Sequence, residues 1–490
     1  MDEIQTGLTT LEQKLKSGKK QLTIGDAASI SAINMDDAKH ALDQLLEKYE
    51  SRLKVTENGD LIYDFGKTLQ RRGKKSFKEI WEEVKATSWK VFKFLFRIWI
   101  TITLVVYFVI FLVLMIGLVV VSLSKGGDDD DSPFDRGGSG GGGIGFFRMY
   151  LIMDLFSDLF MYNTVSRRTI YRTDPRGYRY KEYEPIGRKA KNGETKKSFV
   201  ASVYDFVFGP QRVEPNPLEN YKEVATYLRE KKAVMVQSEI IGLAGWKKDE
   251  AEDFFTECLV KYNGKAEITD KGILYGAFDD LVRGNRDLSN EQEVEWYWDE
   301  YEAPYRQSGN KSTRNVIIGG MNAVNLVVSF KIMQGWLLEI LPGIPMDTAS
   351  LATIFLGYVP FVFSLIFFLV PGVRYFQNKK KNNKIHLNNI RKRLMKVVFQ
   401  SPNGIVQEER LMQIVNQAEK GEEQLDRDQV KAIMEDLIYD LGGELKVSEE
   451  GELAYYFENL KEEMEEIKSI RASRRDDSNL GEVVFDSGNQ

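Results

Sequence analysis

Two uninterrupted apolar stretches stand out in a chain whose other segments alternate apolar and polar positions. Residues 98–123 hold 26 consecutive residues without a charge, and a helix of that length is about 39 Å long. Since the hydrocarbon core of a bilayer is roughly 30 Å thick, this stretch predicts a membrane-spanning helix. Residues 351–375 predict another, because they are almost wholly apolar and a run of lysines follows them at 379–381.

The segment 316–341, just before the second stretch, is apolar but carries Asn322, Asn325 and Lys331. We expect it to pack inside a helix bundle and to form a transmembrane hairpin with its neighbour. Asn322 and Asn325 are three residues apart, so they share one side of a helix. Interhelical hydrogen bonding is the favoured role of this polar group, and a transport pathway is the alternative.

Residues 144–163 are amphipathic, a pattern that fits either an interfacial helix or a spanning helix. Many cations follow this segment, and by the positive-inside rule they favour a crossing here. The sequence then predicts about four membrane helices, with all soluble domains in the cytoplasm.

A pattern of eleven residues recurs three times outside the membrane segments. It reads VTENGDLIYDF from Val55, ITDKGILYGAF from Ile268 and VSEEGELAYYF from Val447. Alternating apolar residues on both sides of a glycine predict a β-hairpin, in which the glycine adopts the positive φ that other residues resist. The three turn glycines are Gly59, Gly272 and Gly451.

An amphipathic helix precedes each predicted hairpin, and in the first two copies a shorter helix precedes that one. Asn34 is placed to cap the longer helix of the first copy, and Cys258 falls on the apolar face of the second, where we expect it to be buried. A helix, a short helix, a turn, a longer third helix and a two-stranded hairpin predict a winged helix-turn-helix. The predicted fold class is an α-rich membrane protein with about four membrane helices and three winged helix-turn-helix-like (α+β) domains.

The predicted organisation follows the chain in order. It comprises winged-helix-like domain 1 (1–66), a basic amphipathic linker helix (67–97), transmembrane helix 1 (98–123), a Gly/Asp-rich loop (124–143), membrane segment 2 (144–163), a basic juxtamembrane segment (164–198), winged-helix-like domain 2 (199–283), a linker (284–314), the transmembrane hairpin (315–376), winged-helix-like domain 3 (386–461) and a charged, partly disordered tail (462–490).

The third helices of the predicted domains are acidic, whereas a helix that enters the DNA major groove needs cations for the phosphates. We therefore expect these helices to contact proteins and not nucleic acid. The predicted interaction residues are Asp36, Asp37 and Asp43 in domain 1, Asp249, Glu250 and Asp253 in domain 2, and Asp428, Glu435 and Asp436 in domain 3.

The amino-acid composition argues against several kinds of functional site. The chain has one cysteine and two histidines, so the sequence predicts no disulfide, no Cys/His metal site and no cofactor. No pairing of nucleophile and base is visible, and we expect no catalytic residue and no enzyme activity. The basic, aromatic stretch from Tyr171 to Lys191 could bind RNA or anionic lipid headgroups, and its position beside a membrane segment favours lipid.

The motif SVYDFVFGP at 202–210, followed by PNPLENYKEVATYLRE at 215–230, resembles a poorly characterised family of membrane proteins of cyanobacteria and chloroplasts. The resemblance implies a bacterial or organellar membrane protein of undefined activity. The first residues show no obvious transit peptide, so we expect a multi-pass protein of the bacterial inner (plasma) membrane.

The expected function is that of a membrane-anchored scaffold or adaptor whose winged-helix-like domains bind protein partners at the cytoplasmic face. A membrane-tethered DNA-binding regulator and a small channel or transporter are the alternatives. The expected partners are membrane lipids, proteins not identified by the sequence and, as a further option, other copies of the chain.

Overall fold

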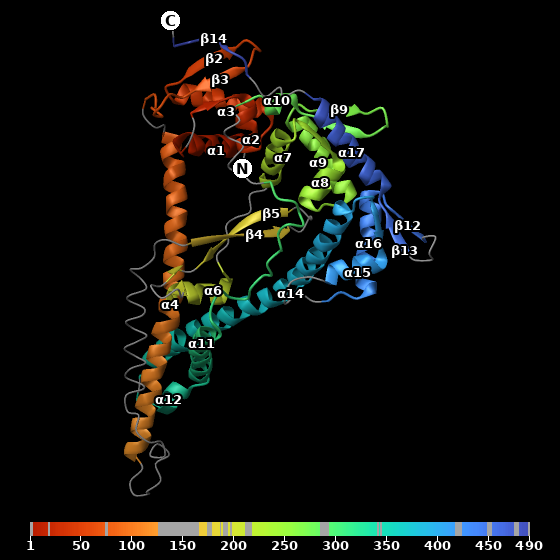
Figure 1. Ribbon diagram of the computed structural model, residues 1–490. Helices are drawn as coiled ribbons and strands as arrows, with labels where there is room; N and C mark the ends of the chain where they lie inside the picture. Colours follow the sequence, from red (N-terminus) through yellow and green to blue (C-terminus); the bar gives the residue numbers. More distant parts are fainter. Residues whose placement is uncertain are drawn as a thin grey trace.

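The computed structural model describes residues 3–17, 20–73, 77–125, 166–173, 179–186, 188–189, 195–196, 198–210, 218–284, 294–340, 343, 345–416, 424–447, 453–474 and 480–488. Within them the chain is mostly helical, with several small antiparallel sheets (Figure 1). Predicted segment 144–163, the Gly/Asp-rich loop after 125 and Gly451 lie outside these residues.

Three helical stretches are long and apolar enough to cross a membrane, among the described residues. They lie in α4 (Phe77–Lys125), in α11 (Ser312–Met333) and in Met346–Gln400, which comprises α13 (Met346–Ala352), a π-helical turn (Thr353–Tyr358) and α14 (Val359–Gln400). The finding supports the span expected at 98–123 and the two expected in the hairpin, whereas a fourth span is not found in the described part of the chain.

The three helices pack together with the short apolar helix α6 (Phe199–Phe208) in the lower half of Figure 1. Leu104 of α4, Val203 of α6, Ile318 of α11 and Phe367 of α14 share one buried cluster. The expected single helix over 316–341 is divided. It ends at Met333, and the short helix α12 (Trp336–Ile340) follows Gly335, whose φ of 92° is the left-handed conformation that ends a helix.

Helix α14 continues from this bundle into the soluble part. The predicted end of the hairpin at 376 and the predicted start of the third domain at 386 both fall inside α14. Its last turns bury Ile390, Leu394 and Val398 in the core of the soluble part. The polar run 377–384 between these two predicted boundaries is helical throughout.

Three soluble units have the same order of elements: a short strand, two helices and two strands. Unit 1 contains β1 (Gln21–Leu22), α2 (Ile24–Ser31), α3 (Met35–Lys48), β2 (Arg52–Thr56) and β3 (Leu61–Asp64). Unit 2 contains β8 (Val234–Val236), α8 (Gln237–Ala244), α9 (Lys248–Lys261), β9 (Lys265–Ile268) and β10 (Leu274–Ala277). Unit 3 contains β11 (Ile405–Gln407), α15 (Glu408–Asn416), α16 (Arg427–Leu441), β12 (Glu444–Val447) and β13 (Leu453–Tyr456).

Each unit's sheet places its last strand in the centre, in the orders β1-β3-β2, β8-β10-β9 and β11-β13-β12. A helix precedes each unit: α1 (Glu3–Ser17), α7 (Glu219–Glu230) and the end of α14. Gly59 and Gly272 have φ of 82° and 83° in the hairpin turns, as predicted. Asn34 caps α3 by accepting a hydrogen bond from the Asp37 backbone N–H, and Cys258 is fully buried, so both predictions are confirmed.

The units are not separate domains joined by linkers. Leu42 of unit 1, Leu243 of unit 2 and Leu437 of unit 3 belong to one continuous buried cluster. Asp26 of unit 1 is fully buried and pairs with Arg229 of α7 at 2.8 Å, which joins unit 1 to unit 2. The three units therefore form one body.

The predicted disordered tail completes this body. Helix α17 (Glu458–Ser473) packs against β8 and α8 of unit 2, and strand β14 (Val483–Asp486) pairs with β2 of unit 1. In the upper part of Figure 1 the C-terminal strand accordingly lies beside the N-terminal unit. Arg471 of α17 donates to both carboxylate oxygens of Glu239, which is fully buried, at 2.7 Å each. The loss of periodicity after the charged start of the tail predicted a partly disordered end, but Arg471 has a buried partner in unit 2 and residues 483–486 form a strand on unit 1.

We predict that Arg471→Ala lowers the free energy of unfolding of the full-length chain by about 3 kcal/mol, because it leaves the buried Glu239 carboxylate without its partner. Chemical denaturation in detergent micelles measures the change. Lys271→Ala is the matched control, since Lys271 pairs with Glu466 on the same helix but is itself exposed, and it should cost less than about 1 kcal/mol. Equal losses in the two variants would contradict the inferred anchoring of α17 by Arg471.

Candidate functional site

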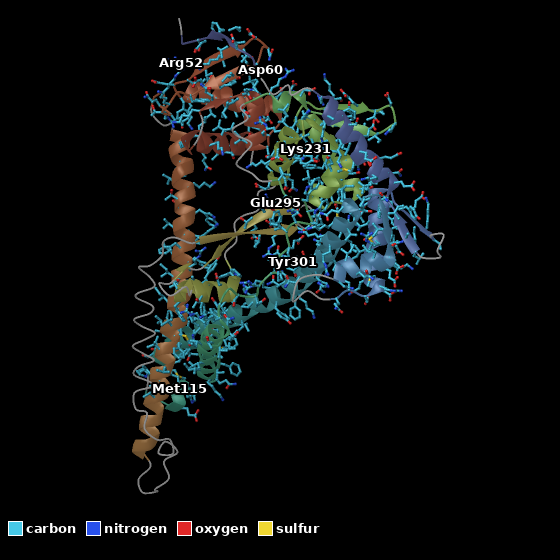
Figure 2. All side chains as sticks on the ribbon, in the orientation of Figure 1. Arg52, Asp60, Met115, Lys231, Glu295 and Tyr301 are labelled. Atoms are coloured by element: carbon cyan, nitrogen blue, oxygen red, sulfur yellow. The ribbon has the colours of Figure 1, made fainter. Side chains whose placement is uncertain are left out.

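The densest group of buried charges lies where the soluble body meets α14. It draws on the hairpin of β4 (Ser166–Thr173) and β5 (Arg179–Ile186), on segment 294–306 and on the second half of α14. Glu295 and Tyr301 of that segment are labelled in Figure 2, between the units and the membrane helices. We call this group the junction cluster. Its members are Tyr171, Arg172, Arg179, Glu182, Glu295, Glu300, Glu302, Tyr305 and Lys392.

The cations of the junction cluster are held by carboxylates and aromatic rings. The Arg172 Nε lies 3.1 Å from the Glu182 carboxylate, and both side chains are 2% exposed. The Arg172 guanidinium also lies over the ring of Tyr305, and that of Arg179 lies 3.8 Å from the ring centre of Tyr171. Such cation–π contacts gain strength when they are desolvated. The two arginines therefore join the hairpin firmly to the segments around it.

Helix α14 provides the other wall of the cluster. Lys392 donates to the Glu300 carbonyl at 2.7 Å and lies 3.7 Å from the Glu302 carboxylate, which is fully buried. The Asn389 side chain makes two hydrogen bonds with the backbone of Glu302, one to its N–H and one to its carbonyl. Asn382 does the same for Tyr305. These contacts hold segment 294–306 along the helix, so the predicted linker 284–314 contains a packed structural segment.

Part of the basic stretch predicted to face lipid has a different position. Arg172 and Arg179 are 2% and 1% exposed and point into the junction cluster. The lipid interpretation was wrong for these two side chains, because acidic and aromatic residues far away in the sequence provide their partners. Their burial also leaves them without access to RNA.

Two neighbouring carboxyl groups in the cluster, those of Glu295 and Glu300, influence each other's pKa. Burial and a hydrogen bond with the neighbouring Glu295 carboxylate raise the pKa of Glu300 to about 7. Burial opposes ionisation of Glu295 too, but hydrogen bonds from Tyr171 and Glu300 keep the pKa of its carboxyl below the usual value. The pair can therefore hold or release a proton near neutral pH, next to Arg179 and Lys181.

The predicted interaction residues remain on the surface of α3, α9 and α16. Asp36, Asp43, Asp249, Asp253, Asp428, Glu435 and Asp436 are exposed, and Asp37 and Glu250 are half-buried. Some have local roles, since Asp37 joins the cap of α3 and Asp43 accepts a hydrogen bond from the Tyr63 hydroxyl. Asp440, another acid of α16, is buried instead and binds Arg391 and the Lys248 backbone N–H, which joins unit 3 to α9 of unit 2.

The three polar residues predicted within the membrane, Asn322, Asn325 and Lys331, do not lie together in the structure. Asn322 and Asn325 are fully buried and donate to the Ser364 carbonyl of α14 and the Leu104 carbonyl of α4, at 3.0 and 3.1 Å. Lys331 is exposed on α11. The two asparagines thus connect α11 to both neighbouring helices, and Lys331 does not face them.

The sequence reasoning missed the junction cluster. Its residues come from three segments far apart in the chain: Thr173 and Glu302 are 129 positions apart, and Glu302 and Asn389 are 87 apart. One signal was present: the basic, aromatic stretch after 166 is matched by an acidic, aromatic stretch, EVEWYWDEYEAPY, from Glu293. Complementary charge in two segments rich in tyrosine and tryptophan could have suggested that they pair.

Within the part of the chain that the structure describes, no group of three or more His, Cys, Asp or Glu side chains is placed to hold a metal ion. The acidic run at 128–131 lies outside that part.

Comparison with known proteins gives one informative likeness. The chain is similar to an uncharacterized chloroplastic protein of Arabidopsis thaliana, with 23% identity over 396 residues, which covers 76% of this chain and 68% of the plant protein. No family model and no solved structure matches. The likeness agrees with the resemblance to a poorly characterised chloroplast-related family. The expected location in a bacterial plasma membrane is contradicted, because the similar protein belongs to a chloroplast; the residues at the start of a chain do not by themselves specify its membrane.

We predict that Asn322→Leu and Asn325→Leu each lower the free energy of unfolding in bicelles by about 1 kcal/mol, which is the size of an interhelical hydrogen bond in a membrane. Lys331→Leu serves as the control and should leave stability unchanged, since the side chain is exposed. Unchanged stability in both asparagine variants would count against their role as links between helices.

The Glu300 titration predicts a pH dependence. Because the folded-state pKa is raised to about 7, the folded chain binds more protons than the unfolded chain between about pH 4.5 and 7, and stability falls as pH rises through this window. Glu300→Gln should flatten this fall in the melting temperature measured across the window. Asp299→Asn is the control, because that neighbouring carboxylate is exposed. A wild-type melting temperature that does not fall over the window would disprove the raised pKa.

Proposed function

We propose that the chain is a membrane-anchored scaffold in which three winged-helix-like units bind protein partners through the acidic faces of α3, α9 and α16. The assignment of the fold to each unit is supported by the shared order of strand, two helices and hairpin, and by the central position of the last strand in each sheet. A fully buried phenylalanine follows each hairpin, at Phe65, Phe278 and Phe457.

The observation that carries the proposal is the exposure of most of the predicted acidic residues on α3, α9 and α16. The units contact one another through α2 and α7, through α17, and between α9 and α16, whereas seven of the nine predicted acidic residues stay exposed. Two large apolar side chains are exposed next to the acids, Val260 on α9 (76%) and Tyr439 on α16 (66%). Exposed aliphatic and tyrosine side chains among charges are typical of protein interfaces.

The alternatives fit less well. A winged helix that reads DNA presents cations on its third helix, and acidic faces would repel phosphates. A transport pathway would use polar groups that face a common route, but Asn322 and Asn325 bond to neighbouring helices and Lys331 lies apart from them. Neither alternative gains support from the arrangement of its key residues.

The junction cluster supports a rigid platform. It ties the soluble body to α14, and α14 enters the membrane bundle without a break. The three acidic faces would then be presented in a fixed arrangement on one side of the membrane. The similar chloroplastic protein favours a chloroplast membrane as the location.

The test is chemical crosslinking in native chloroplast membranes, followed by identification of partners that depend on one face. Asp428→Lys, Glu435→Lys and Asp436→Lys are combined on α16, and the matched control combines Glu458→Lys, Glu462→Lys and Glu465→Lys on the exposed side of α17. We expect the α16 variant to lose at least one partner that the wild type and the control retain. Loss from both variants alike, or salt-sensitive binding of DNA by the wild type, would refute the proposal.

A further inference from the structure

The hairpin of unit 1 already carries an added strand. Strand β14 from the C-terminus pairs antiparallel with β2, with Phe485 opposite Val55 and Asp486 opposite Lys54. The Ser487 backbone N–H donates to the Leu53 carbonyl at 3.0 Å, and the Ser487 hydroxyl accepts from the Leu53 N–H at 2.9 Å. The molecule thus shows how an extended peptide occupies the outer edge of one of its hairpins.

The corresponding edges of units 2 and 3 are open. All four residues of β9 and all four of β12 are exposed, and neither strand has a second neighbour among the described strands. Ile268 is 70% exposed and Val447 is 66% exposed. An exposed edge with apolar side chains is a template for pairing with another strand, and proteins usually cover or protect such edges.

The strand pairing within each hairpin aligns the three edges residue by residue. Val55 lies opposite Leu61, Ile268 opposite Leu274 and Val447 opposite Leu453, so these three residues are equivalent. The residue one position earlier on each outer strand is charged, and we compare the edges by the sign of this charge.

That residue is Lys54 in unit 1, Glu267 in unit 2 and Lys446 in unit 3. Lys54 lies 4.0 Å from Asp486 of the added strand. Lys446 reproduces this charge, and its present partner is the exposed Glu444, a surface pair that costs little to exchange. Glu267 has the opposite charge and accepts a hydrogen bond from Tyr275, so unit 2 would repel an acidic strand. Both open edges are exposed, but the edge of unit 3 is the one whose charge is complementary to the aspartate of the tail.

We propose that the outer edge of β12 is a docking site for an extended segment of a protein partner that resembles the tail of this chain: consecutive apolar residues followed by an aspartate. The segment adds a strand to unit 3 as β14 does to unit 1, its apolar residues cover Leu445 and Val447, and its aspartate pairs with Lys446. This site is separate from the acidic face of α16, and it stands whether or not that face binds a partner.

The probe is a fluorescent peptide of residues 480–488, LGEVVFDSG, titrated into the full-length chain in nanodiscs. The chain's own tail occupies β2, so saturable binding reports an open edge. We expect Lys446→Glu to weaken binding about tenfold and Lys431→Glu, the same charge change at an exposed position of α16, to leave it unchanged. A peptide with Asp486→Lys should bind the wild type poorly and recover on the Lys446→Glu chain.

The other outcomes are equally decisive. Binding that Lys446→Glu leaves unchanged, or that occurs only after the chain's own strand β14 has been deleted, would overturn the proposal. Self-association of the wild type that depends on Lys446 and on β14 would also overturn it, because the occupant would then be a second copy. The α16 variant with three lysines should still bind the peptide, so failure at the acidic face and failure at the β12 edge are distinguishable.

Discussion

Helix α14 connects three different environments, although Pro371 inside it has no backbone N–H and so interrupts its helical hydrogen bonds. Its first half packs in the membrane bundle around Phe367, its middle binds segment 294–306 through Asn382 and Asn389, and its end fills the core of unit 3 with Leu394. The position of the soluble body relative to the membrane bundle therefore depends on this helix and on the polar contacts along its middle.

Those contacts explain why so many charges are buried at the junction. A charge removed from water is tolerated where it is paired or hydrogen-bonded, and Arg172, Glu182 and Lys392 each have such partners. Pairs of this kind contribute less net stability than apolar packing would, but they accept few alternative arrangements. The junction cluster accordingly holds the soluble body on α14, and burial together with the Glu295 hydrogen bond raises the pKa of its Glu300 to about 7.

The units themselves combine repetition with differences at their surfaces. Their cores share an equivalent residue, as the fully buried Phe65, Phe278 and Phe457 after the matching strands show. Their free edges are not: β2 is covered by β14, while β9 and β12 are open and differ in charge. A repeated core can thus carry different docking surfaces, because edge residues contribute little to the core and are free to vary.

Local patterns were enough to identify what depends on local chemistry. The uncharged run at 98–123 indicated a membrane helix, glycine indicated the turns at Gly59 and Gly272, and the cap at Asn34 could be assigned from its position. These features follow from hydropathy, φ preference and hydrogen bonding within a few residues. The remaining features of the structure depend on which side chains pack next to one another in the fold. Whether Arg172 contacts lipid or Glu182, whether the tail is free or forms β14, and whether Asp440 faces a partner or Arg391 all depend on residues distant in the chain. Charge and polarity set the cost of burying a side chain, but only the tertiary structure supplies the partner that offsets that cost.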